Sequence, residues 1–514
     1  MAEDSDRDRQ EYDRRVRRVA KGGGLDVLGR FASRGIGVIS APVTSRLLGG
    51  GGYGLYFVAT QLIVLLSLLV LGGYPRAVLR YVGIYDGEGR PRCARAVVVG
   101  TLFTAMGIAA VFAALLVLFP DLVTVDIYGK PSMTPVLQIL AVCLPARVAF
   151  LLLSQATVAR GTALYRVLSD LANRVVILAG VLLLCGALDL GPDGAAYAYV
   201  LGAAGAGAVA LAGVMRLYGR VQFRDLRHFD LYAVTVFAFP LLLEQLSQYG
   251  LYRANAVIGG RWLSDADLGQ YGAASQAAIV GVFGLSALGL MFSPIMADLH
   301  NRDKMDDLRE MFATTTRWGY YFAVPVLTVA FLKPESVMAV FGPEFADAGP
   351  VLQLLSVGQL LSVSAGAAGY VLIMSGYQWL SAFDSFLMAA VNIVLCIVLT
   401  RWMGIVGLAI AGMVATGGVN LLRAAQVWWI HRISGYTLPA VRPLLIGVAL
   451  LPIMLISLEP WWLDLLVPLG LYTTAFVLAV RRVGLDRDDR QVLNAIRRRL
   501  RSVFRPSPPT DSGG

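Results

Sequence analysis

The chain has 514 residues, of which 57% are hydrophobic and only 15% are charged. A soluble domain carries roughly 25% charged residues, so this composition excludes a soluble globular protein of this size. Apolar runs of about 20 residues, the length that crosses ~30 Å of hydrocarbon, recur from end to end. We therefore expect an all-α polytopic membrane protein.

Hydropathy and turn residues predict about fourteen membrane spans. Glycine-rich connectors, such as those at 49–52 and 191–194, separate the spans. In chain order the expected spans cover residues 24–48, 54–82, 94–119, 134–159, 163–188, 194–218, 232–259, 267–297, 308–332, 348–374, 378–401, 405–431, 438–458 and 462–481.

The sequence repeats itself at an offset of about 215 residues, a pattern typical of transporters with a site between two halves. The register extends far along the chain, since Pro-Val-Leu-Gln at 135–138 recurs at 350–353. Each copy holds an even number of expected spans, six, so the two copies are predicted to be parallel repeats. The residues Arg46, Leu48, Gly54, Tyr56, Ala59 and Gln61 recur as Arg261, Leu263, Gly269, Tyr271, Ala274 and Gln276.

The formal charge of +10 does not indicate nucleic-acid binding. The basic surplus lies in the tails and short loops, as the positive-inside rule predicts for a protein of the cytoplasmic (inner) membrane with both termini cytoplasmic. The segment 1–21 lacks the apolar core of a removable signal peptide, and residues 486–504 can form a basic amphipathic helix. The expected domains are a charged tail (1–22), an N-lobe (23–218), a linker (219–231), a C-lobe (232–432), two further spans (433–482) and a basic tail (483–514).

Charged residues inside the spans predict a cationic cavity. An ionised side chain at mid-bilayer costs about 2.5–3.5 kcal/mol, so these residues should face protein or water. Arginine outnumbers acid there, and its fork of donors matches the oxygens of a pyrophosphate. Two alternatives stay open, because Arg30 can reach the cytoplasmic face and Arg174 can pair with Asp170. The candidate binding residues are Arg30, Arg34, Arg147, Arg174 and Arg253.

Two acidic residues inside the spans are candidates for coupling to H⁺ or Na⁺. Glu244 follows Pro240, which can kink its helix, and Asp384 lies on the eleventh span. The alternative for Glu244 is a salt bridge to an arginine of the first half. The four cysteines lack paired spacing, and no phosphate-binding glycine loop or catalytic triad stands out. We therefore expect neither an enzyme, a metal site nor a bound cofactor.

Short motifs follow one another in a specific order over residues 25–435. They include Ser-Arg-Leu-Leu-Gly at 45–49, Tyr-Gly-Leu-Tyr at 53–56, Asp-Leu-Gly-Gln-Tyr-Gly at 267–272 and Phe-Gly-Pro-Glu-Phe at 341–345. In this order they resemble the Wzx-type polysaccharide flippases of the multidrug/oligosaccharidyl-lipid/polysaccharide exporter superfamily.

The resemblance implies a V-shaped fold of two lobes around a central cavity. It also implies transport of polyprenyl-pyrophosphate-linked oligosaccharide, the repeat unit of a surface polysaccharide such as O-antigen, from the cytoplasmic to the outer leaflet. Membrane lipids and polysaccharide-assembly proteins are the implied partners. Some lipid II flippases of the superfamily bind sodium through an Asn four residues before an Asp on span eleven. Here Leu380 stands before Asp384, so the resemblance does not extend to that site.

Two other functions are compatible with a polytopic bundle. An ion-coupled multidrug exporter should have a cavity in which acidic residues outnumber basic ones, the opposite of the pattern in this chain. A non-transporting scaffold of a glycan-assembly complex should have paired intramembrane arginines and no open cavity.

Overall fold

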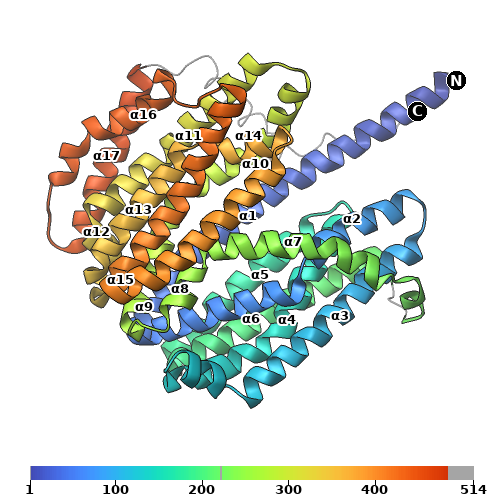
Figure 1. Cartoon of the computed structure of the whole chain (residues 1–514), viewed down its shortest axis with the longest axis horizontal. Helices are drawn as coiled ribbons and strands as arrows, with labels where there is room; N and C mark the ends of the chain where they lie inside the picture. The colour runs from blue at the N-terminus through green and yellow to red at the C-terminus, as the bar shows by residue number, and fades with distance from the viewer. Residues whose placement is uncertain (1, 220–222, 484–514) are drawn as a thin grey trace, which may run out of the picture.

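The computed structural model describes residues 2–219 and 223–483, with side chains from residue 31 onward at nearly all positions. Helices and their connections make up these residues, which contain no strand. The two bundles in Figure 1 meet at one end and diverge toward the other, which confirms the expected all-α, two-lobed fold. The basic helix predicted at 486–504 lies outside the described residues.

The first lobe is formed by the chain up to residue 218. Gly49 has non-helical backbone angles (φ 67°, ψ 173°) and divides the long α1 into two helices. The elements are α1 (Ala2–Leu71), α2 (Tyr74–Gly87), α3 (Pro91–Leu118), η1 (Leu122–Ile127), η2 (Pro131–Met133), α4 (Thr134–Ala159), α5 (Leu164–Val181), η3 (Leu182–Ala187) and α6 (Gly191–Tyr218).

The rest of the chain begins with η4 and α7 and then forms the second lobe. The last two helices, α16 and α17, pack against α11 of this lobe. Gly404 (φ 59°, ψ −136°) divides its longest helix, α15, as Gly49 divides α1. The elements are η4 (Phe223–His228), α7 (Leu231–Tyr252), α8 (Ala254–Gly259), α9 (Asp265–Ala278), η5 (Ile279–Val282), α10 (Phe283–Asn301), α11 (Met305–Leu332), α12 (Pro334–Met338), η6 (Pro343–Ala348), α13 (Gly349–Ser364), α14 (Ala368–Met374), α15 (Gln378–His431), α16 (Leu438–Ala449), η7 (Leu451–Leu455) and α17 (Trp461–Val483).

Among the described residues, nine helices are long and apolar enough to cross a membrane, or ten if the bent pair 343–374 is one span. The two longest of these contain the breaks at Gly49 and Gly404. The count of about fourteen spans stays a prediction. The outer surface is apolar, and Trp379 and Trp402 are 79% and 82% exposed, as expected of aromatic residues at a membrane interface.

Glycines, more often than prolines, mark the interruptions of the helices. Helices α4, α7 and α11 continue through Pro145, Pro240 and Pro325. The observed breaks include Gly72 and Gly366, both with positive φ, a conformation that glycine adopts without the steric cost of a Cβ. The kink expected at Pro240 stays a prediction, because a proline can bend a helix without ending it.

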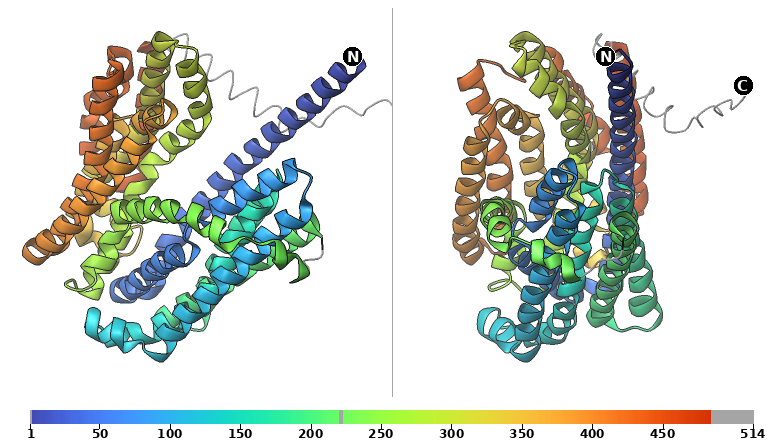
Figure 2. Two further views of the ribbon diagram at one scale, coloured as in Figure 1. Left: turned by 45° about the vertical axis from the view of Figure 1, so that its right-hand side comes forward. Right: turned by 90° about the vertical axis from the view of Figure 1, so that its right-hand side faces the viewer.

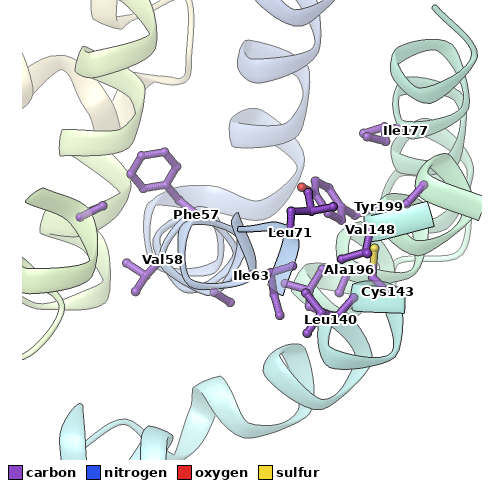
Figure 3. Close-up of a cluster of buried hydrophobic side chains, with 14 of the residues drawn as sticks. Phe57, Val58, Ile63, Leu71, Leu140, Cys143, Val148, Ile177, Ala196 and Tyr199 are labelled. Atoms are coloured by element: carbon purple, nitrogen blue, oxygen red, sulfur yellow. The ribbon is translucent and has the colours of Figure 1, made fainter. Parts of the chain in front are cut away.

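The largest buried core joins the first lobe to the beginning of the second. It includes Ile63 of α1, Leu140 and Val148 of α4 and Tyr199 of α6, which Figure 3 shows around the end of α1. Residues of α9, α12 and α13 extend the same core. The core therefore extends through the first lobe and into the joined part of the second, and Figure 2 shows the two bundles from two further sides.

Two glycines form the closest contact between the lobes. A Cβ atom on Gly54 would lie 1.8 Å from the carbonyl oxygen of Asp265, and one on Gly269 would lie 2.1 Å from that of Gly50. Gly54 and Gly269 occupy corresponding positions of the sequence repeat. Because neither residue has a side chain, the helix after Gly49 and α9 touch through their backbones.

We expect Gly54→Ala to destabilise the protein, because the methyl group must push α9 away from α1, an overpacking cost of about 1–3 kcal/mol. Gly107→Ala is the matched control, since the position lies inside α3 and a Cβ there would meet nothing within 4 Å. Alanine at residue 107 should be neutral or stabilising. The measurement is the Tm of each purified protein, and equal Tm values for the two variants would contradict the contact.

Candidate functional site

Helix α7 runs between the two lobes and ends in the region where the charged residues gather. Its Gln245 donates to the carbonyl oxygen of Gly72 in the first lobe at 2.7 Å, whereas its Gly250 accepts from Asn392 of α15 at 2.8 Å. The helix stops at Tyr252, and α8 begins only after Arg253, whose φ is −136°. The break places Arg253 at the junction of two helix segments.

Arg147 is held in a fixed orientation inside the first lobe. Its Nε donates to Oγ of Ser67 at 3.1 Å, and its Nη1 donates to the hydroxyl of Tyr199 at 2.7 Å. Both partners are buried, at 1% and 8% exposure, while Arg147 itself is half-buried. Remaining guanidinium donors are therefore free to bind an anion only on the side away from these two residues.

Arg174 and Arg253 approach Arg147 from α5 and from the end of α7. The guanidinium groups of Arg147 and Arg174 are close enough to Arg253 to repel it, and all three interact electrostatically with Tyr199. The structure thus brings together three of the five predicted arginines. We call Arg147, Arg174 and Arg253 the arginine cluster.

Arg34 lies next to this cluster and faces the second lobe. Gly37, one turn further along α1, has its Cβ position 3.6 Å from Nη1 of Arg174. The guanidinium carbon of Arg34 lies 5.4 Å from the ring centre of Phe283 at the beginning of α10, within the range of a cation–π contact. The fifth predicted residue, Arg30, belongs to α1, but its side chain is outside the described set.

Three of the candidate arginines have exposed side chains. Arg34, Arg174 and Arg253 are exposed, and Tyr252 is 46% exposed although protein surrounds it. Exposed arginines at membrane depth require a water-filled cavity, since lipid would not solvate them. The arrangement is therefore a cluster of positive charge, with Asp170 one turn before Arg174 on α5 offsetting part of it.

Glu244 lies apart from the arginine cluster and forms a salt bridge with Arg76 of α2. This is the alternative that the sequence left open, a salt bridge to an arginine of the first half. The pair links α7 to the first lobe, close to the contact between Gln245 and Gly72.

Asp384 is buried within the second lobe. Its Oδ1 accepts a hydrogen bond from Nε2 of Gln426 at 2.8 Å, and its Oδ2 has no hydrogen-bond partner among the described atoms. The neighbouring Arg423 donates instead to the Ser381 carbonyl oxygen and to Ser385 Oγ, at 3.0 and 2.6 Å. Asp384 thus has one carboxylate oxygen that is buried and without a hydrogen-bond partner among the described atoms.

The sequence did not single out the residues that orient the arginines. Ser67 and Tyr199 are an ordinary serine and tyrosine within apolar spans, and no pattern relates them to Arg147, which is far away in the chain. For Tyr252, the one sequence feature that could have indicated a place near the cluster is its position beside Arg253.

Residues 19–300 match the family described as "Polysaccharide biosynthesis protein". The chain is 23% identical over 351 residues to the succinoglycan biosynthesis transport protein ExoT of Rhizobium meliloti (strain 1021), with 66% of each protein covered. It is also 23% identical over 193 residues to the uncharacterized membrane protein EpsK of Bacillus subtilis (strain 168), with 37% of each covered. The matches span less than two thirds of the length of either relative.

Solved structures share the fold. The lipid II flippase MurJ in an inward closed conformation has a TM-score of 0.69 at 14% identity, covering 88% of this chain and 98% of MurJ. An inward-facing multidrug resistance MATE family transporter of the MOP superfamily has a TM-score of 0.65 at 13% identity, covering 77% and 94%. A MOP superfamily transporter from Pyrococcus furiosus Vc1 (DSM3638) has a TM-score of 0.55 at 14% identity, covering 81% and 95%.

We expect Tyr199→Phe to lower stability, because the variant removes the acceptor of Arg147 Nη1 in a largely buried environment, at a cost of about 1–3 kcal/mol. Tyr197→Phe on the same helix is the matched control, since Tyr197 is 49% exposed. Thermal unfolding of both purified variants measures the difference. Equal Tm values would show that the hydroxyl of Tyr199 does not hold Arg147.

Proposed function

The chain belongs to the polysaccharide biosynthesis protein family and is a multi-pass membrane protein. From this premise we propose that it is a transporter, and that it moves a polyprenyl-pyrophosphate-linked oligosaccharide from the cytoplasmic to the outer leaflet. The observation that carries the proposal is the arginine cluster, in which Arg174 and Arg253 have exposed side chains. The lipid tail remains in the bilayer while the pyrophosphate and sugars cross through the cavity.

The charge of the cavity favours a pyrophosphate over a cationic drug. Arg147 and Arg174 both repel Arg253 in the absence of an anion, and a pyrophosphate between them would replace this repulsion by charge-assisted hydrogen bonds. A drug exporter with the same fold needs the opposite cavity charge to bind a cation. The multidrug alternative is therefore not favoured.

Aromatic side chains on the second-lobe side of the cavity suit the sugars. Phe283 contacts Arg34, and Tyr370 lies close enough to interact with both Arg34 and Tyr252. Rings of this kind offer an apolar face and, in tyrosine, a polar hydroxyl. We place the pyrophosphate near the arginine cluster and the first sugars between Arg34 and these rings.

The positive-inside pattern sets the direction of transport in this proposal. The contacts between the lobes near Gly54 and Gly269 lie at the end opposite the N-terminus in Figure 1. With both termini in the cytoplasm, the cavity opens to the cytoplasm, from which the lipid-linked substrate is loaded. Alternating access then requires the lobes to part at their joined end.

We expect Arg174→Ala and Arg253→Ala each to weaken binding of a polyprenyl pyrophosphate about 10- to 100-fold, the loss of one or two charge-assisted hydrogen bonds. Binding to purified protein in nanodiscs and glycan export in a flippase-null strain are the measurements. Arg302→Ala is the control, since Arg302 pairs with Asp298 on the surface at 2.9 Å. Wild-type binding by both cluster variants would remove the basis of the proposal.

For ion coupling we propose Asp384 rather than Glu244, because Glu244 is paired with Arg76 and Oδ2 of Asp384 is unpartnered. The double variant Arg76→Gln/Glu244→Gln keeps the two groups matched, so we expect export to retain its dependence on the H⁺ or Na⁺ gradient. Asp384→Asn should abolish that dependence. The measurement is export at imposed gradients, and loss of gradient dependence in the double variant alone would assign coupling to Glu244.

A further inference from the structure

Arg46 reaches across the joined end from the first lobe to the second. Its Nε donates to the carbonyl oxygen of Val340 at 2.9 Å, and its Nη2 donates to that of Ala339 at 3.0 Å. These carbonyls directly follow the short helix α12, where backbone acceptors lack helical partners and attract a cation. The preceding residue, Ser45, donates to the carbonyl oxygen of Phe341 at 2.8 Å.

Arg261 makes the corresponding contact in the other direction. Its Nη1 donates to the carbonyl oxygens of Ile127 and Asp126 in the first lobe, at 2.8 and 3.3 Å. These carbonyls lie at the end of η1. The residue before Arg261, Gly260, packs against the ring of Tyr128, since a Cβ there would lie 2.6 Å from it.

The two contacts are equivalent in the sequence as well as in space. Arg46 and Arg261 correspond in the repeat, and each acceptor pair ends two residues before a glycine with positive φ, Gly129 or Gly342. The neighbouring contacts of Ser45 and Gly260 follow the same register. Each lobe therefore presents one arginine and one pair of carbonyls to the other lobe.

We propose that Arg46 and Arg261 are two matched latches that hold the lobes closed at this end, and that both must release before the cavity can open there. The role of the latches in a transport cycle rests on the proposed function. Their existence does not, because they are defined by contacts between the lobes. Both arginines are exposed, so water can replace the carbonyls when the lobes separate. This makes the contacts reversible, as a transport cycle requires.

Neighbouring residues distinguish these latches from permanent links. Lys333 and Asp464 form an ion pair within the second lobe, with side chains only 9% and 14% exposed, and so have little access to water. Asp464 lies one turn after Trp461, whose ring centre is 5.5 Å from the guanidinium carbon of Arg46. Helix α17 thus presents a fixed surface against which the latch of Arg46 closes.

The test is a distance measurement between spin labels on the two lobes, with the full chain in nanodiscs. Labels at Leu122→Cys and Glu335→Cys suit this purpose, because Leu122 is 60% exposed and Glu335 is exposed on the other lobe. The four native cysteines are buried. We expect Arg46→Ala and Arg261→Ala each to raise the open-to-closed ratio about three- to tenfold, the effect of losing exposed hydrogen bonds.

The double variant should raise the ratio by the product of the two single effects, since the two contacts share no atoms. Arg401→Ala is the control, because Arg401 stacks on Trp262 at 4.9 Å within the second lobe and should leave the distances unchanged. A double variant with the wild-type distance distribution would overturn the proposal, as would an effect of only one arginine. If the latch variants open the joined end while Arg174→Ala and Arg253→Ala still bind polyprenyl pyrophosphate normally, the latches stand and the proposed substrate fails.

Discussion

The backbone contact between Gly54 and Gly269 is the constraint on which the arrangement of the lobes depends. At each glycine a Cβ atom would overlap a carbonyl oxygen of the other lobe, so no other residue permits the same approach. Around this point the chain places the turns at Gly49 and before Asp265, from which both lobes diverge. The point at which α9 crosses the part of α1 after Gly49 therefore sets how the two lobes, and the arginines they carry, are placed relative to each other.

Much of the fold could be predicted from the sequence, because its physical cause is local. Apolar runs of bilayer length identify membrane helices, and the repeat marks Gly54 and Gly269 as equivalent. The breaks were harder to predict. A proline in a helical sequence suggests a kink or a break, but Pro145, Pro240 and Pro325 lie inside continuous helices. The breaks at Gly72 and Gly366 depend on positive φ, which tertiary packing selects from many glycines.

The candidate site was partly predictable for the same reason. The cost of burying charge drew attention to Arg147, Arg174 and Arg253, and the structure places them together. Their partners were not predictable, since Tyr199 meets Arg147 only through the packing of α6 on α4. The salt bridge of Glu244 also needed the structure, because Arg76 lies in a different lobe and many arginines were available.

Arg253 occupies the break of a helix that is attached to both lobes, through Gln245 on one side and Gly250 on the other. Beyond Arg253, Asn255 is again bonded to Asn392 of the second lobe, so Arg253 follows the second lobe, whereas Arg147 and Arg174 belong to helices of the first. The distances between Arg253 and the other two arginines therefore change when the lobes rotate. A ligand that binds all three arginines would therefore bind most tightly at one angle between the lobes.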